Sequence, residues 1–461
     1  MKALTKILLL YQIIFFFLVA QEIPNEFYHF KFQKSRFDIG LDWEKNSTFG
    51  PVRFNHGNLK SDSLIINSRL GINLFSKSIG LYGFGHFTYK SNFHGYLYSR
   101  IVNNPENFDR YSGISREISR LNFNSGETDI SGISYENNWM ILQFGRGRQS
   151  WGAGNDIQLV LSETSNAYDY GMLDLDFGKL KVRYFHGYLE TDSLFYNRYI
   201  SGRGIEWNNN KNILFGLSEI VVYSGEKRPI DFAYFNPIST HLEIELNDRQ
   251  NDLGSDNGNG VWQVSFDYSN GKKIRISGNY LIDEFVIDKV QKDEGKGHGD
   301  GYSLRLVYSP ISIPTILSSI YFSIVSVGTN TFKHEDGRNN YVQRYKPLGW
   351  ENGSDTREIK MGINNISNSN KYFVNIELGS LEVGEKNLLN FPYSPYIYYS
   401  AGEFPSGDVE KQIFLKSQIQ LWIRSYFSIS SKIKMIKPFQ KKALKEFQFG
   451  FDLYFPISTI I

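Results

Sequence analysis

The chain has 461 residues, with 50 Lys and Arg, 48 Asp and Glu, and no cysteine. The absence of cysteine excludes disulfides, Cys-ligated zinc, iron–sulfur clusters and thiol nucleophiles. Removal of Lys2 and Lys6 with the export segment described next leaves 48 basic residues (50 less 2) against 48 acidic ones. A formally neutral chain has no sequence-wide basic field for nucleic acid, so no nucleic-acid partner is expected.

Residues 1–20 have the pattern of a cleavable secretory signal peptide. Lys2 and Lys6 flank the start of an apolar run over residues 7–19, and Ala20 is the last residue before the expected cleavage site. A charged start, a short apolar core and a small residue at the cleavage site are typical of such signals. The run is shorter than the ~20 residues of a membrane-spanning helix, and no later run approaches that length. We therefore predict export, with residues 21–461 forming one mature domain.

Apolar and polar residues alternate with a period of two in several segments. In residues 36–44, one parity carries Phe37, Ile39, Leu41 and Trp43, and the other carries Asp38, Gly40, Asp42 and Glu44. The pattern recurs in residues 66–74, 262–268, 274–282, 302–308 and 447–455. A helix would not separate these residues onto opposite faces, whereas a strand does. The sequence therefore predicts an all-β protein, a transmembrane antiparallel β-barrel with apolar side chains toward lipid and polar ones toward the lumen.

The segments between these strands predict two kinds of connection. Residues 208–212 and 269–272 are rich in Asn, Ser and Gly and indicate short hairpin turns. The longer polar stretches at residues 103–127, 245–260 and 289–301 are expected to be external loops or a plug inside the barrel. A mature chain of about 440 residues, at roughly ten per membrane strand plus connections, predicts 14 to 20 strands, and we expect about eighteen.

The C-terminal segment is an aromatic-rich strand, with Phe447, Phe449, Phe451 and Phe455 on one face. It resembles the terminal signal that the outer-membrane assembly machinery reads, although six residues follow Phe455. A secreted β-sandwich or propeller would also alternate. The sequence has no repeat of fixed period, and aromatic residues near strand ends are typical of barrel girdles, so the barrel is favoured.

The short motifs in the sequence do not indicate a catalytic site. The glycine-rich stretch at residues 145–154 does not have the spacing of a nucleotide-binding loop. The eight histidines are scattered, and residues 252–260 lack the ordered spacing of a calcium loop. Glu163, Asp169, Asp174 and Asp176 supply carboxylates for a glycosidase pair, but a sequence does not give their separation. We expect no catalytic residue, no metal and no cofactor.

An ordered series of short motifs begins with Gly145-Arg146 and Trp151-Gly152-Ala153-Gly154. It continues through residues 159–163, 168–169, 173–180, 203–207, 217–223, 234–237 and 281–288, with a weaker match at 348–355. Over residues 140–360 this series resembles the capsule assembly Wzi family of outer-membrane proteins. Ala153 stands where the family usually has Pro, and Trp350 where His is more typical.

The resemblance implies an outer-membrane barrel of about eighteen strands that binds capsular or other exported polysaccharide and helps to assemble or retain it at the cell surface, without enzymatic activity. Aromatic faces pack against sugar C–H groups, and planar polar groups bind hydroxyls. The candidate binding residues in the region of resemblance are Arg146, Arg148, Trp151, Asn155, Trp207, Tyr234 and Asn236.

Other interpretations of these residues and of the barrel stay open. Trp and Tyr are also girdle residues, and a lumen Arg often pairs with a carboxylate. A porin or substrate-specific channel is the alternative function, because a wide barrel leaves an aqueous lumen unless something fills it. An outer-membrane hydrolase would need a positioned nucleophile or acid–base pair.

Overall fold

The structure is a computed structural model that describes residues 47–50 and 64–460. Short gaps lie at residues 76–77, 91, 109, 118–120, 252–257, 272, 285–288, 294, 296, 314–315, 368–371, 396–401, 425–426 and 440–441. The predicted signal peptide (1–20) and the predicted strand at 36–44 lie outside the described residues. No helix among the described residues is long and apolar enough to cross a membrane.

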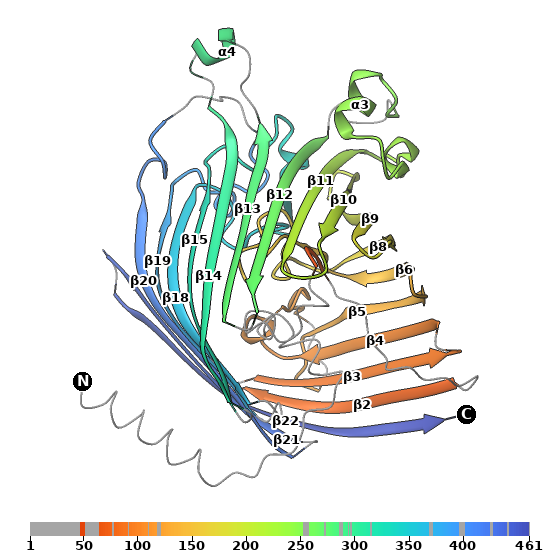
Figure 1. The fold of residues 1–461 in the computed structure, drawn as a ribbon, viewed down its shortest axis with the longest axis vertical. Helices are drawn as coiled ribbons and strands as arrows, with labels where there is room; N and C mark the ends of the chain where they lie inside the picture. The colour runs from red at the N-terminus through yellow and green to blue at the C-terminus, as the bar shows by residue number, and fades with distance from the viewer. Residues whose placement is uncertain are drawn as a thin grey trace.

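Eighteen antiparallel strands pair in chain order and close into a barrel, because the last strand pairs with the first (Figure 1). They are β2 Leu64–Phe75, β3 Ser78–Tyr89, β4 Phe93–Val102, β5 Ser125–Glu136, β6 Met140–Gly147, β8 Tyr168–Asp176, β9 Leu180–Thr191, β10 Tyr196–Asn208, β11 Ile213–Glu226, β12 Asn259–Asn270, β13 Ile274–Glu284, β14 Gly299–Ile313, β15 Ile316–Val327, β18 Thr356–Ser367, β19 Tyr372–Val383, β20 Glu410–Arg424, β21 Phe427–Pro438 and β22 Leu444–Ile460. The barrel and the strand number are confirmed. Each strand predicted from residue 66 onward lies in a barrel strand.

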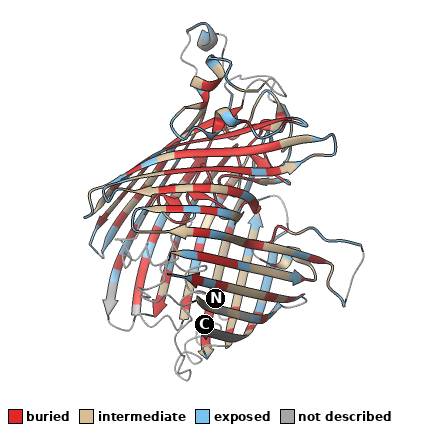
Figure 2. Ribbon diagram, turned by 90° about the vertical axis from the view of Figure 1, so that its right-hand side faces the viewer, coloured by how far each residue is buried: buried red, intermediate tan, exposed pale blue. Residues whose placement is uncertain are grey.

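The period-two pattern separates the two faces of the wall as predicted. On β12, Gln263, Ser265 and Asp267 are buried toward the lumen, while Val264 is exposed on the outside. On the final strand, Phe449 is exposed outward. Buried positions alternate with exposed or intermediate ones along many strands of the wall (Figure 2). Apolar residues thus cover the outer surface, as a transmembrane barrel requires.

The two ends of the barrel differ. All eight connections at one end have four residues or fewer, including the predicted turns after β10 and β12. The other end carries the long connections, residues 103–124, 148–167, 227–258, 285–298, 328–355 and 384–409. They include the short helices η2 Pro105–Asn107, η3 Phe232–Phe235, α3 His241–Leu246, α4 Lys289–Asp293 and η4 Gly337–Asn339. Outer-membrane barrels have short periplasmic turns and long external loops, so the long-loop end is the outer end.

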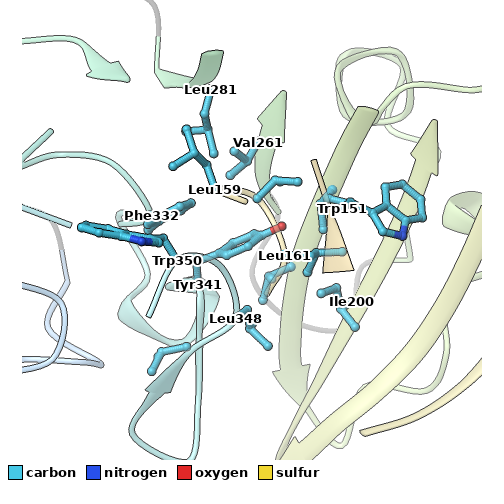
Figure 3. Close-up of a cluster of buried hydrophobic side chains, with 14 of the residues drawn as sticks. Trp151, Leu159, Leu161, Ile200, Val261, Leu281, Phe332, Tyr341, Leu348 and Trp350 are labelled. Atoms are coloured by element: carbon cyan, nitrogen blue, oxygen red, sulfur yellow. The ribbon is translucent and has the colours of Figure 1, made fainter. Parts of the chain in front are cut away.

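Two of the long connections, residues 148–167 and 328–355, fold into the lumen and form a plug with Phe49 (Figure 3). Strand β1 Phe49–Gly50 pairs with β7 Ser150–Trp151, and β16 Val342–Gln343 pairs with β17 Lys346–Pro347. Trp151 is 0% exposed, and its ring lies 4.8 Å from that of Phe49 and 5.2 Å from that of Phe185 on the wall. A plug is thus present, but it is formed by residues 148–167 and 328–355, whereas the stretches 103–127, 245–260 and 289–301, expected as external loops or plug, lie mainly in the other long connections.

Polar residues of the lumen face hold the plug backbone. The side chain of Asn279 accepts from the Ala153 N–H at 2.7 Å and donates to the Ala153 carbonyl at 3.0 Å. Gln263 accepts from the Val160 N–H at 3.0 Å. Gly152 has φ 135°, and a Cβ there would lie 3.0 Å from the Asn279 oxygen, so only glycine suits this close approach. Glycine in this stretch thus lets the plug backbone approach the barrel wall closely.

Candidate functional site at the outer mouth

Three of the predicted binding residues belong to the plug. Arg148 is buried, pairs with Asp129, and donates to the Ser165 carbonyl at 2.6 Å and to the Ser112 hydroxyl at 2.8 Å. Trp151 lies in the apolar core, and Asn155 is buried near it in the chain. These side chains present little surface to a ligand in this conformation. Their arrangement fits a role in holding the plug.

The other four predicted residues lie in separate places. Trp207 is exposed on the outer wall near the short-turn end and stacks on Phe215 at 6.3 Å, as a girdle residue would. Tyr234 is fully buried beneath an external loop, and Asn236 is exposed on that loop. Arg146 lines a small cavity at the outer end. The structure therefore does not bring the seven residues together, and their role in binding stays a prediction.

A large open cavity of about 1640 Å³ occupies the outer mouth of the barrel. Its walls come from the ends of β9 and β10, the loop between β15 and β18, and the connections after β4 and β19. The aromatic and charged residues that line it are Tyr111, Tyr196, Tyr345, Tyr393, His334, Arg198, Arg338, Arg344, Lys346, Glu190, Asp192, Glu226, Glu335 and Asp336. This combination of aromatic faces and planar charged groups lies at the entrance, above the plug.

The floor of the cavity is held by Arg198. This side chain is 1% exposed, and its Nη1 lies 2.6 Å from Oε1 of Glu190. Its other nitrogens donate to the carbonyls of Arg338 and Asn340, at 2.5 and 2.8 Å. The hydroxyl of Tyr393 donates to the same Glu190 oxygen at 3.0 Å. Burial raises the pKa of Tyr393 to about 12, so its phenol keeps its proton at neutral pH.

A strained turn projects into the cavity. Arg344 and Tyr345 connect β16 to β17, and both have left-handed backbone conformations, with φ of 46° and 66°. Asn-Gly is the preferred pair for a two-residue hairpin of this kind, because bulky residues rarely adopt positive φ. The Tyr345 side chain is nevertheless 72% exposed, and its ring packs edge-on against Tyr393 at 5.7 Å. Strain of this kind is concentrated at functional sites, where the surrounding structure holds it.

A second cavity of about 580 Å³ adjoins the first, and both are lined by Arg344 and residues 112–114. Its charged residues include Arg146, whose Nη1 lies 3.2 Å from Asp169, and the exposed Arg116. Arg344 also lies 3.9 Å from Glu190, so this guanidinium connects the two cavities. Together they form one extended polar surface across the outer end.

The sequence offered no local signal for this site. Glu190 and Arg198 lie on one hairpin, but Arg344 and Tyr393 are far from it in the chain, and only the closed barrel brings these segments together. Arg146 is the one predicted residue that lines either cavity. Among the described residues, no group of three or more His, Asp or Glu side chains is arranged to hold a metal ion.

Comparisons with solved structures agree with this architecture. The chain superposes on Wzi, an outer-membrane protein involved in group 1 capsule assembly in Escherichia coli and a carbohydrate-binding β-barrel, with a TM-score of 0.56 at 14% identity over 87% of this chain and 85% of that one. The chain has the fold of an outer-membrane β-barrel. OccD3 and OprD of Pseudomonas aeruginosa give TM-scores of 0.45 and 0.44 at 8% and 9% identity, covering 86% of this chain and 91% and 95% of theirs.

The likeness to Wzi concerns the fold, because identity this low does not carry a ligand from one protein to another. No protein-family model matches the sequence, and no curated protein matches it. The resemblance seen in residues 140–360 is therefore supported at the level of the barrel. The role of the mouth must be argued from its own side chains.

Proposed function

We propose that this protein binds exported polysaccharide in the mouth cavity and retains it at the cell surface, from a position in the outer membrane and without a chemical step of its own. The observation that carries the proposal is the cavity of about 1640 Å³ lined by four tyrosines and three arginines at the long-loop end. Pockets for drug-sized ligands measure ~300–1000 Å³, so this one suits several linked units of a polymer.

The side chains of the cavity match the chemistry of sugars. Tyrosine rings offer flat faces to C–H surfaces, and guanidinium groups bind hydroxyls or carboxylates through paired N–H donors. The Arg338 guanidinium stacks on the Tyr196 ring at 3.8 Å and lies 3.3 Å from Asp192, so both groups are pre-oriented. Many weak contacts along one polymer chain add up through multivalency.

The competing function is a porin or substrate-specific channel. Residues 148–167 and 328–355 fill much of the lumen with an apolar core, which favours binding at the entrance over diffusion through the barrel.

Deletion of the gene tests the proposal. We expect total polysaccharide to stay unchanged while polymer moves from the cell surface into the medium, and complementation with the wild-type protein to restore surface retention. Unchanged surface polysaccharide together with lost uptake of a small solute would instead establish the channel. Loss of polymer synthesis itself would point to an enzymatic or export role and contradict the proposal.

A further inference from the structure

On the outward face of β11, exposed apolar residues are followed by buried residues toward the outer end. Leu217 is exposed on the outside, but Glu219 and Tyr223 continue the same face toward the outer end and are buried. The opposite face of the strand is the lumen face, because Ile220 and Val222 belong to the plug core. Glu219 and Tyr223 therefore lie on the lipid side of the wall, beneath a cover.

Neighbouring strands carry more polar groups on this outer face. Arg203 of β10 has its Nε 3.1 Å from the Glu219 carboxylate, and both side chains are buried. The His186 ring of β9 lies 2.8 Å from the Tyr223 hydroxyl. Charged groups on the lipid face of a barrel are unfavourable at the depth of the hydrocarbon. This part of the wall therefore needs shielding from lipid.

The described part of the connection between β11 and β12, residues 227–251 and 258, supplies that shield, and we call it the flap (Figure 1, upper right). The first residue of α3, His241, places its Nδ1 2.7 Å from Glu219 and donates its backbone N–H to the same carboxylate at 3.2 Å. Tyr234 stacks on Tyr223 with 4.6 Å between the ring centroids, and the Arg228 guanidinium lies 4.9 Å from the centre of the Tyr223 ring. The flap thus folds back along the outside of the wall.

The flap exposes a group of large apolar side chains, next to the polar Asn247 and Asp248 and the Arg249–Glu243 ion pair. Phe232, Ile238 and Leu246 are 83%, 85% and 81% exposed. Leu242 is also exposed and lies one helical turn before Leu246, on the same face of α3. A cluster of large exposed apolar side chains marks a surface that meets another apolar phase.

We infer that the flap lies in the outer leaflet of the membrane, with these side chains against lipid. The lipid-facing surface leads directly to it, because Ile205, Leu217 and Val264 are paired across β10, β11 and β12 and are all exposed. The next outward row toward the outer end contains the covered Arg203 and Glu219. The flap therefore covers the wall from the row at which its outward residues change from apolar to charged.

The exposed apolar band continues on β14. Its outward residues Tyr302, Leu304, Leu306 and Tyr308 are all exposed, and Tyr302 lies in the same row as Val264 through the pairing of both with Tyr280. On β10 and β11 the row beyond this band carries the charged pair Arg203 and Glu219, which the flap covers. The flap thus covers the polar outward residues of β9–β11 and anchors the outer mouth to the outer leaflet.

Single-cysteine labelling tests the inference without background, because the chain has no cysteine. The full-length protein carrying Phe232→Cys, Ile238→Cys or Leu246→Cys is labelled with an environment-sensitive fluorophore and reconstituted in phosphatidylcholine vesicles. Phe215→Cys on the exposed outer wall is the lipid control, and Tyr345→Cys in the mouth is the water control. Heat-modifiable migration in electrophoresis confirms that each variant is folded.

We expect the three flap labels to show blue-shifted emission, quenching by brominated acyl chains and little quenching by iodide, as for Phe215→Cys. Iodide quenching equal to that of Tyr345→Cys would overturn the inference. Labels that neither quencher reaches, with emission that depends on the protein-to-lipid ratio, would show that a second copy covers the flap and would also overturn it.

Discussion

Arg198 and Glu190 form a 2.6 Å ion pair between β10 and β9, and the same arginine donates to two backbone carbonyls of the plug loop. The pair therefore connects the rigid wall to the loop that builds the mouth. Because the arginine is 1% exposed, its donors have little access to replacement by water.

Replacing Arg198 by Met should loosen the mouth while leaving the barrel intact. Breaking a buried ion pair by removing one partner costs about 3–5 kcal/mol, and because Glu190 is partly exposed to the cavity we expect a loss of about 3 kcal/mol or less. We expect limited proteolysis to cut within residues 328–355 in the variant, with unchanged heat-modifiable migration. Lys411→Met is the control: its pair with Glu382 at the outer ends of β20 and β19 is largely exposed, and such pairs contribute about 0–1 kcal/mol. Equal protease sensitivity of both variants would mean that Arg198 does not hold the loop.

Trp151→Ala should open the plug. The side chain fills the space between Phe49 and Phe185, and removal of a buried Trp costs about 3–5 kcal/mol through lost contacts and the cavity left behind. We expect a higher single-channel conductance in planar bilayers than for the wild type. Trp207→Ala removes the same side chain from the outer wall and should leave conductance unchanged.

The final strand allows the assignment of faces to be tested. Phe449 is exposed on the lipid side, and Gln448 has the opposite parity. Phe449→Asp should impair membrane assembly far more than Gln448→Asp, because an Arg or Lys that faces lipid costs about 2–4 kcal/mol at mid-depth and an Asp somewhat less. The amount of folded barrel in the membrane fraction measures the difference. Equal yields would contradict the assignment.

Lys333 gives the plug loop a defined pH dependence. Burial lowers the pKa of this amine from 10.5 to about 8. Its charged form is therefore disfavoured in the folded state, and this destabilisation is complete below pH 8 and is relieved as the pH rises toward 10.5. Thermal unfolding of the wild type should gain stability over that range relative to Lys333→Met. A difference between the two proteins that does not change with pH would contradict the shift.

The sequence predicted the wall because the bilayer imposes a simple rule on it. Alternation located strands such as residues 262–268, since each lumen-facing polar residue has an apolar neighbour facing lipid. The alternation of apolar and polar residues says nothing about loops that fold into the lumen or over the outer wall. Trp151 and Tyr234 looked like ligand contacts, yet both are fully buried, one in the plug and one in the flap against Tyr223 of the wall. The outward Glu219 interrupts the alternation, because the flap replaces lipid there.

The residues of the mouth cavity could not be predicted from the sequence, for a related reason. Arg344 and Tyr345 form an unremarkable dipeptide in the sequence, and their importance comes from a two-residue turn with positive φ at both positions. Glu190 and Arg198 belong to neighbouring strands, but their partners Tyr393 and Asn340 come from connections far along the chain. Only the closed barrel brings these groups to one cavity.

The double variant Arg344→Asn/Tyr345→Gly tests the central claim most directly. It introduces the residues that the turn prefers, so the barrel should assemble at wild-type levels while the guanidinium and the ring disappear from the cavity. Asn210→Gly, at a positive-φ position of a short turn at the opposite end, is the matched control. In a deletion strain complemented with each protein, we predict that the double variant releases polysaccharide into the medium several-fold more than the wild type or the control. Wild-type amounts of surface polysaccharide with the double variant would contradict the account.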